Sequence, residues 1–260
     1  MELLKTREVS INFGGLWAVD KVDFSIEEGE IVGLIGPNGS GKTTFFNLIS
    51  GIYTPTRGFI HFKGHDISHK TAYEVRNLGI SRTFQSSRLC WNLSVVDNVL
   101  TGLLARQKTS WWKAILSPAF SNEELQEGYE KSLEYLRYFN EELVDRRYAK
   151  VKNIPHIDRR RIEICRALVS DPDLLLLDEP SAGLNPEETM DMMDDIRRIK
   201  EHNKKISIII IEHDMAVIRQ VSDRVVVFNA GKKIAEGAFS EVARSEEVIR
   251  AYLGEEASAC

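Results

Sequence analysis

The chain has 260 residues, 43% of them hydrophobic and 28% charged, and its formal net charge is −5. This length predicts one large domain, or a core with a subdomain, that buries a substantial apolar interior. The acidic balance argues against a broad nucleic-acid-binding face, which is normally basic, so no nucleic-acid partner is expected. The longest purely apolar runs, such as Ile208–Ile211, are far too short to span a bilayer.

The cysteines indicate a reducing compartment. Cys90, Cys165 and Cys260 are odd in number and their spacing fits no metal motif, so we expect free thiols. The segment Met1–Arg7 lacks the apolar stretch of a signal peptide, and none is expected. A role at a membrane would therefore depend on docking onto another component.

The first predicted elements are strands. Short β-type runs alternate with turns over Leu3–Phe62, and Ile31–Ile35 is a continuous apolar strand that ends in a Gly/Pro/Asn turn. A helix is predicted over Lys42–Ser50. Strand, glycine loop and helix, in this order, are the context that a phosphate-binding loop requires.

The middle of the chain has a different pattern. Between Ser86 and Val169 it is helical, most clearly over Glu123–Asp145, where large apolar side chains recur at helical spacing. We predict a helical insertion in an α/β nucleotide-binding core. The later predicted elements are strands Leu174–Leu177 and Ile206–Ile211, a helix Glu187–His202, a hairpin of Val225–Phe228 and Lys232–Ala235 around the turn Asn229–Gly231, and a last helix Glu241–Leu253.

The loop Gly36–Thr43 matches the pattern G-x-x-x-x-G-K-[ST]. Its glycines let backbone N–H groups turn inward around phosphates, Lys42 supplies a cation to the β/γ oxygens, and Thr43 offers a hydroxyl to Mg²⁺. The following helix points its positive end at the phosphates. A plain glycine-rich turn is the alternative, but the strand–loop–helix context favours an ATP·Mg²⁺ site. The predicted nucleotide-binding residues here are Gly36, Pro37, Asn38, Gly39, Ser40, Gly41, Lys42, Thr43 and Thr44.

A second motif consists of the apolar run Leu174–Leu177 followed by two acids, Asp178 and Glu179. A hydrophobic strand that ends in Asp is how such enzymes hold Mg²⁺ at the carboxyl edge of a sheet. Glu179 is then placed to polarise the attacking water. Without the phosphate loop, a core strand with a solvated end would explain the run equally well.

Together these motifs resemble the ABC ATPase family, over essentially the whole chain. Gly36–Thr43 corresponds to Walker A, and Leu174–Glu179 to Walker B. The resemblance implies an α/β fold: a P-loop NTPase (RecA-like) core with an N-terminal antiparallel β subdomain and an inserted α-helical subdomain. It implies one ABC ATPase domain over 1–260, with 1–85 and 168–260 as the nucleotide-binding core and 86–167 as the helical subdomain.

The resemblance also assigns residues that would mean little alone. Gln85 resembles the Q-loop glutamine, which touches Mg²⁺ and nucleotide and senses the membrane partner. His213 resembles the switch histidine that contacts the γ-phosphate, and it is predicted to be catalytic together with Glu179. Phe13 occupies the place of the aromatic that stacks on adenine, although such a residue is more often core. Ser181–Pro186 resembles the D-loop, with Asn185 where many members carry Asp.

Further segments narrow the resemblance to the ATP-binding subunits of branched-chain amino acid importers and their urea-importer relatives: Phe13–Val19, Arg82–Gln85, Ala182–Pro186 and Val248–Gly254. It implies an ATPase at the cytoplasmic face of the membrane, peripheral to it. The implied partners are a second ABC ATPase subunit, two permease subunits and, indirectly, a substrate-binding protein. A weakly hydrolytic or non-hydrolytic regulatory cassette and a urea or amide importer ATPase remain alternatives.

The family pattern breaks at Ile154–Asp158, the ungapped equivalent of the signature loop, usually Leu-Ser-Gly-Gly-Gln, that closes over ATP on the opposite subunit. Ile157 is β-branched where the family brings backbone close to phosphate, and Pro155 has no N–H to donate. Either Asp158 simply caps a helix whose first turn is Arg159–Arg161, or these arginines form a modified anion site. The missing glycines favour a heterodimer with a cassette that has an intact signature.

Trp111 and Trp112 form the other unusual feature. Two adjacent tryptophans in a polar region are either local core or a face for a membrane partner.

Overall fold

The computed structural model describes residues 1–106 and 118–256, so Trp111, Trp112 and Cys260 lie outside the described residues. A six-stranded sheet with the order β10-β9-β3-β8-β7-β6 forms its centre. All neighbouring pairs in it are parallel except β9 with β10. Every residue of β3, β7 and β8 is buried, as expected for apolar strands covered on both faces. The strands are β3 (Ile31–Ile35), β6 (Ile80–Arg82), β7 (Leu174–Asp178), β8 (Ser207–Ile211), β9 (Arg224–Asn229) and β10 (Lys232–Gly237).

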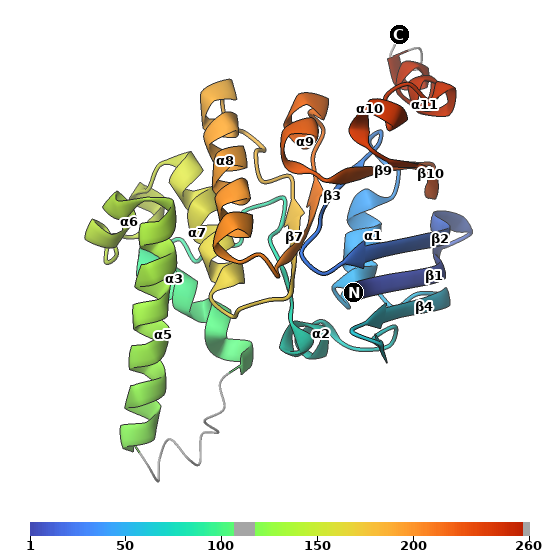
Figure 1. The fold of residues 1–260 in the computed structure, drawn as a ribbon. Helices are drawn as coiled ribbons and strands as arrows, with labels where there is room; N and C mark the ends of the chain where they lie inside the picture. The colour runs from blue at the N-terminus through green and yellow to red at the C-terminus, as the bar shows by residue number, and fades with distance from the viewer. Residues whose placement is uncertain (107–117, 257–260) are drawn as a thin grey trace.

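A second, antiparallel sheet has the order β2-β1-β4-β5 and lies beside helix α1 (Lys42–Ile49) (Figure 1). Its inner face and α1 share one hydrophobic cluster, in which Phe45 packs edge-on against Phe24 and at a tilt against Phe228. This cluster joins the two sheets and anchors the helix that follows the phosphate loop. The strands are β1 (Glu2–Phe13), β2 (Leu16–Glu27), β4 (Arg57–Phe62) and β5 (His65–Asp66).

Helices between β6 and β7 form a group on the side of the molecule away from the antiparallel sheet (Figure 1). The predicted fold class, a P-loop core with an antiparallel sheet and inserted helices, is confirmed, while the boundaries at 85/86 and 167/168 stay a prediction. The inserted helices are α3 (Val95–Leu100), η1 (Thr101–Arg106), α5 (Pro118–Phe139), α6 (Glu141–Asp145), η2 (Val151–Asn153) and α7 (His156–Leu168). The others are α2 (Ala72–Leu78), α8 (Pro186–His202), α9 (Met215–Val221), α10 (Phe239–Val242) and α11 (Glu246–Glu256).

Two predicted helical stretches are divided by polar caps. Asn140 separates α5 from α6, because its side chain accepts the N–H of Glu142 and begins a new helix. The predicted last helix, Glu241–Leu253, is wrong as one element: α10 ends at Val242, and α11 begins after Ser245, whose carbonyl accepts the N–H of Ile249. Asn and Ser favour helix starts, so these signals were present in the sequence.

The predicted terminal hairpin is confirmed. Lys232 pairs with Asn229, and Ala230 and Gly231 between them both have positive φ. This is the two-residue turn that matches the twist of antiparallel strands. Cys90 and Cys165 are free, as expected.

Candidate functional site

The phosphate loop joins the end of β3 to α1, and its glycines determine its path. Gly36, Gly39 and Gly41 have φ values of 146°, 73° and 103°. A Cβ atom on Gly36 would lie 2.1 Å from the carbonyl oxygen of Phe228, and one on Gly41 would lie 2.3 Å from that of Ala18. Only glycine fits at these two close approaches.

Lys42 lies inside the curve of this loop and is only 5% exposed. Its Nζ atom donates to the carbonyls of Gly36 (2.7 Å) and Pro37 (2.8 Å) and to Ser40 Oγ (3.3 Å). A Cβ atom on Gly39 would meet nothing within 4 Å, so this side of the loop is open. A cation, an open backbone concavity and a helix N-terminus together fit a phosphate group.

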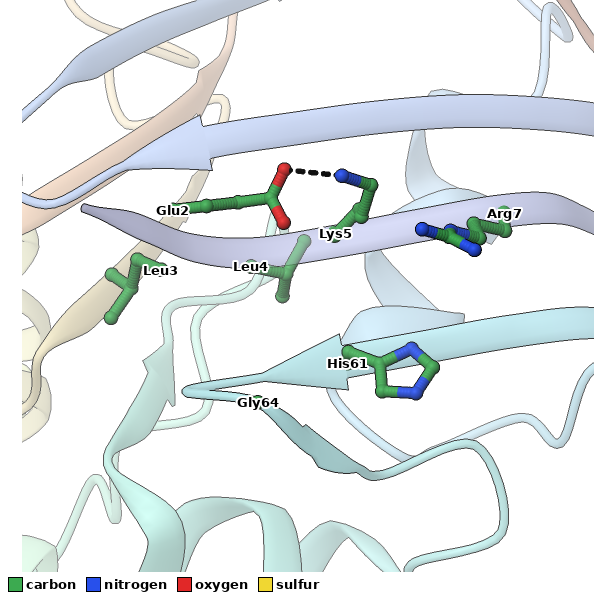
Figure 2. A pocket seen from close by; sticks show the side chains of 7 residues that line it. All are labelled: Glu2, Leu3, Leu4, Lys5, Arg7, His61 and Gly64. Atoms are coloured by element: carbon green, nitrogen blue, oxygen red, sulfur yellow. Dashed lines mark hydrogen bonds and ion pairs between the residues drawn. The ribbon is translucent and has the colours of Figure 1, made fainter.

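The other loop residues predicted to bind nucleotide differ in their exposure to solvent. Asn38 and Thr43 are exposed, Thr44 is half-buried in the first turn of α1, and Pro37 and Ser40 are buried. A hollow of about 330 Å³ beside Lys5, Arg7 and His61 on β1 and β4 is lined by other residues than those of the loop (Figure 2). A loop that presents backbone amides to solvent forms a cradle rather than an enclosed pocket.

Asp178 ends β7 and is 1% exposed. Its Oδ2 accepts a hydrogen bond from Arg82 Nη2 at 2.7 Å, whereas its Oδ1 is buried without a hydrogen-bond partner among the described residues. Burial raises the pKa of Asp178, and the ion pair with Arg82 opposes that shift. A buried carboxylate oxygen left unsatisfied fits a ligand for a divalent cation.

Arg82 is the residue at this position that sequence reasoning missed. Its guanidinium also donates to Asn47 Oδ1 of α1 (2.6 Å) and to Oγ of Ser50, the C-cap of α1 (3.2 Å), and it stacks on Phe46 and Phe84. It therefore ties the metal-ligand candidate to the helix behind the phosphate loop. The sequence contains an arginine three residues before Gln85, but nothing local indicates its partner on a distant strand.

Glu179 brings two other predicted residues together. Gln85 Nε2 donates to its Oε2 at 2.8 Å, and His213 Nε2 lies 2.6 Å from its Oε1. Glu179 has a φ of 50°, in the left-handed region that non-glycine residues rarely adopt. Such strain persists only where surrounding contacts hold it, and it is concentrated at functional sites.

The loop after Glu179 is held by a buried carboxylate. Ser181 donates its N–H (2.9 Å) and its hydroxyl (2.6 Å) to Glu212 Oε1. Burial raises the pKa of Glu212, and the hydrogen bonds from Ser181 oppose that shift. Asn185 caps α8 by accepting the N–H of Glu188 at 2.9 Å.

In the altered segment Ile154–Asp158, the helix starts earlier than predicted. Helix α7 begins at His156 with Pro155 as its N-cap, so the prediction that Asp158 caps the helix is wrong. Asp158 is buried in the first turn, where it accepts from Asn140 Nδ2 (3.2 Å) and Arg161 Nη1 (3.1 Å). The fixed φ of proline suits a helix start, so the cap residue lies three positions earlier than the acid.

Phe13 is 46% exposed and packs edge-on against Tyr53, with ring centroids 5.3 Å apart. An exposed aromatic face is available for stacking, but its role with adenine stays a prediction.

A family model described as ABC transporter matches residues 19–182, more than half of the chain. The chain belongs to the ABC transporter family. A second model, described as branched-chain amino acid ATP-binding cassette transporter, matches residues 232–258. The cassette is thus an ATP-binding, ATP-hydrolysing transport subunit, as the sequence predicted.

Relatives match the cassette over nearly its whole length. The high-affinity branched-chain amino acid transport ATP-binding protein LivG of Salmonella typhimurium is 38% identical over 254 residues, covering 97% of this chain and 98% of its own. The corresponding BraF of Pseudomonas aeruginosa is 36% identical over 257 residues, with coverage of 97% and 98%.

Two solved structures agree with the fold. A nucleotide-free ATP-binding cassette from an ABC transporter matches with a TM-score of 0.84 and 29% identity, over 97% of this chain and 99% of that one. The ADP conformation of an ATP-binding cassette matches with a TM-score of 0.84 and 30% identity, over 98% and 99%. Within residues 1–106 and 118–256, no helix is both long and apolar enough to cross a membrane.

Proposed function

We propose that the loop Gly36–Thr44 holds the phosphates of ATP, and that Thr43, Gln85 and Asp178 hold Mg²⁺ beside it. The observation that carries this proposal is the meeting of Gln85, Glu179 and His213 next to a buried, half-satisfied Asp178. Bound magnesium would offset the charge on the phosphate oxygens. Phe13 offers a face for the adenine ring.

In this proposal Glu179 is the catalytic carboxylate that accepts a proton from the attacking water. His213, 2.6 Å from one of its oxygens, contacts the γ-phosphate, and Gln85 orients the other oxygen. These contacts help to hold Glu179 in a backbone conformation that a non-glycine residue rarely adopts.

The test is Glu179→Gln in the assembled transporter. Turnover should fall by about 100-fold or more, because general-base catalysis contributes on this scale, while the Kd for Mg·ATP stays within about twofold. Glu201→Gln, an exposed change on α8, is the matched control and should leave both quantities unchanged. Wild-type turnover in Glu179→Gln would show that the assignment is wrong.

We propose further that the cassette powers import of branched-chain or other small amino acids from the cytoplasmic face of a membrane. The relatives' names and the match at residues 232–258 support this substrate class over urea. In a strain that lacks this cassette, uptake of labelled leucine should be restored by the wild-type chain and not by Lys42→Ala. Restoration of urea uptake instead would overturn the substrate class.

The altered signature supports a heterodimer, with a second cassette, two permease subunits and, indirectly, a substrate-binding protein. In a homodimer both ATP sites would face Ile154–Asp158, and phosphoryl transfer depends on well-placed donors. The loss of one such donor typically costs about 100- to 1000-fold in rate. Arg160 and Arg161 are ion-paired to acids of this chain. This argues against the interpretation of Arg159–Arg161 as a replacement anion site.

The isolated cassette should therefore hydrolyse ATP slowly, and its cognate cassette and permeases should raise the rate greatly. In the assembled complex, Lys42→Ala should reduce turnover more than the equivalent change in the partner cassette. Robust, cooperative hydrolysis by the isolated chain would refute the heterodimer.

A further inference from the structure

Arg160 lies on the first turns of α7 and is buried, so its guanidinium requires partners within the protein. Its Nη1 donates to Glu163 Oε2 at 3.1 Å. Its Nη2 donates to two backbone carbonyls, that of Gln85 at 3.1 Å and that of Ala182 at 3.2 Å. One nitrogen thus joins two loops that are far apart in the sequence.

Both of these carbonyls belong to residues that bond directly to Glu179. The side chain of Gln85 donates to Glu179 Oε2 at 2.8 Å, and the N–H of Ala182 donates to the carbonyl of Glu179 at 3.0 Å. Arg160 therefore reaches Glu179 by two separate paths, one to its carboxylate and one to its backbone. Glu179 is also the strained residue, with its positive φ, so its position depends on such neighbours.

The same face of α7 holds the rest of the loop that contains Gln85. Glu163 Oε1 accepts the N–H of Arg88 at 3.2 Å, and Arg166 Nη1 donates to the carbonyl of Arg88 at 2.7 Å. Residues 160, 163 and 166 are three apart, so they line one face of the helix. The loop is therefore fixed to α7 at Arg88 by two hydrogen bonds and at Gln85 by Arg160, which also extends the attachment to the loop after β7.

We infer that Arg160 is a positioning residue for Glu179, acting through Gln85 and Ala182, so that the placement of α7 determines the placement of the catalytic carboxylate. This inference rests on the proposed role of Glu179. Hydrogen bonds weaken steeply beyond about 3.5 Å, so a small shift of α7 is enough to release one of the two loops. Arginine is needed because its planar fork serves an acid and two carbonyls at once.

The test is Arg160→Lys in the assembled transporter, because lysine keeps the charge but loses the fork. We expect kcat to fall by about tenfold or more, and KM for ATP to stay within about twofold, because the phosphate loop is untouched. Arg161→Lys is the matched control. Arg161 is adjacent, half-buried and ion-paired to Asp158 and Asp195, and none of its hydrogen bonds reaches either loop. A wild-type kcat in Arg160→Lys, or an equal fall in Arg161→Lys, would overturn the inference.

Two further measurements separate positioning from simple loss of stability. Amide hydrogen exchange should quicken at 85–88 and 180–184 in Arg160→Lys and not in Arg161→Lys. In a double-mutant cycle with Gln85→Ala, the fold loss of kcat in the double variant should be smaller than the product of the two single fold losses, because both changes act on one path. Independent, multiplicative losses would refute the path through Gln85.

If Arg160→Lys does not assemble, Glu163→Gln weakens its ion pair instead and should lower kcat several-fold at an unchanged KM. A wild-type kcat in that variant overturns the inference. The result for Glu179→Gln separates a failure of the proposed function from a failure of the positioning role of Arg160. If Glu179→Gln turns over normally, the proposed function itself fails. If it is inactive while Arg160→Lys is normal, only the inference fails.

Discussion

The phosphate loop and the start of α7 follow the family pattern to very different degrees. The loop keeps every glycine and the lysine, and these residues make the contacts that hold its curve. The segment Ile154–Asp158 has lost the serine and both glycines, and its proline begins a helix whose first acid turns inward. One region has a geometry that fits a phosphate, while in the other the buried acid bonds to residues that hold the helix in place.

This difference separates two tasks within one cassette. In the proposed site, nucleotide and Mg²⁺ are held in cis by the loop, α1, the carboxyl end of β7, Gln85 and the exposed face of Phe13. Contact with nucleotide on a partner requires backbone that can approach phosphate closely, which Pro155 and Ile157 do not provide. On the proposed function, the chain would supply an intact phosphate loop to one side of a shared ATP site and an altered segment to the other side.

The largest effect is expected from Lys42→Ala, which tests the intact region. Removing the ammonium group that bonds to the carbonyls of Gly36 and Pro37 should weaken Mg·ATP binding by at least about 100-fold, or about 2.7 kcal/mol. Calorimetry on the isolated chain measures this. Lys205→Ala, an exposed change just before β8, is the control and should bind normally. Equal affinity in wild type and Lys42→Ala would remove the loop from the site.

A smaller effect, in the opposite direction, should follow from repairing the altered region. Pro155→Ser combined with Ile157→Gly restores an N–H and a close backbone approach, so ATPase activity of the isolated chain should rise by about tenfold. Glycine within the first turn should cost about 1 kcal/mol of stability, visible as a lower Tm. The exposed change Asn153→Ser is the control. An unchanged rate in a folded double variant would show that this segment does not limit hydrolysis.

Motifs and apolar runs in the sequence were sufficient to predict the central strands and the phosphate loop. Ile31–Ile35 is an entirely apolar segment next to a glycine loop, and both its burial and the following helix are as predicted. Such features depend on local pattern and on backbone freedom at glycine, which the sequence states directly. The predicted carboxyl-edge position of Asp178 is also what the structure has.

What could not be predicted depends on side chains that meet across the fold. The ion pair of Arg82 with Asp178 joins residues 96 positions apart, and the hydrogen bonds from Ser181 to Glu212 join residues 31 apart. Asp158 was misjudged for the same reason: a cap is local, but Asn140 and Arg161 draw this acid inward. Partner choice among buried polar groups is decided by tertiary contacts, which spacing along the chain does not reveal.

A third prediction compares two glycines of the intact loop. Gly39→Ala should cost about 1 to 2 kcal/mol through its left-handed φ but meet no neighbour, so the chain should fold and bind ATP less well. Gly36→Ala should lower Tm much more, because its methyl group would collide with the carbonyl of Phe228. Thermal melts and calorimetry on both variants measure this contrast. Equal losses of Tm would contradict an open cradle at Gly39.

The smallest effect concerns Glu212, which accepts two hydrogen bonds from Ser181 in the loop after β7. Because burial raises its pKa above the usual 4.5, the folded chain keeps this proton after the unfolded chain has released it. The contribution of Glu212 to the stability of the wild type therefore falls as pH rises above about 4.5, and Glu212→Gln removes this dependence, since the amide has no charge to bury. Ser181 can still donate to the amide oxygen of the variant. Thermal melts from pH 4 to pH 8 should show a Tm difference that opens in favour of Glu212→Gln with rising pH, with Glu246→Gln, an exposed change, as control. A difference that is constant with pH, or that favours the wild type at neutral pH, would mean that Ser181 stabilises the charged carboxylate by more than burial costs it.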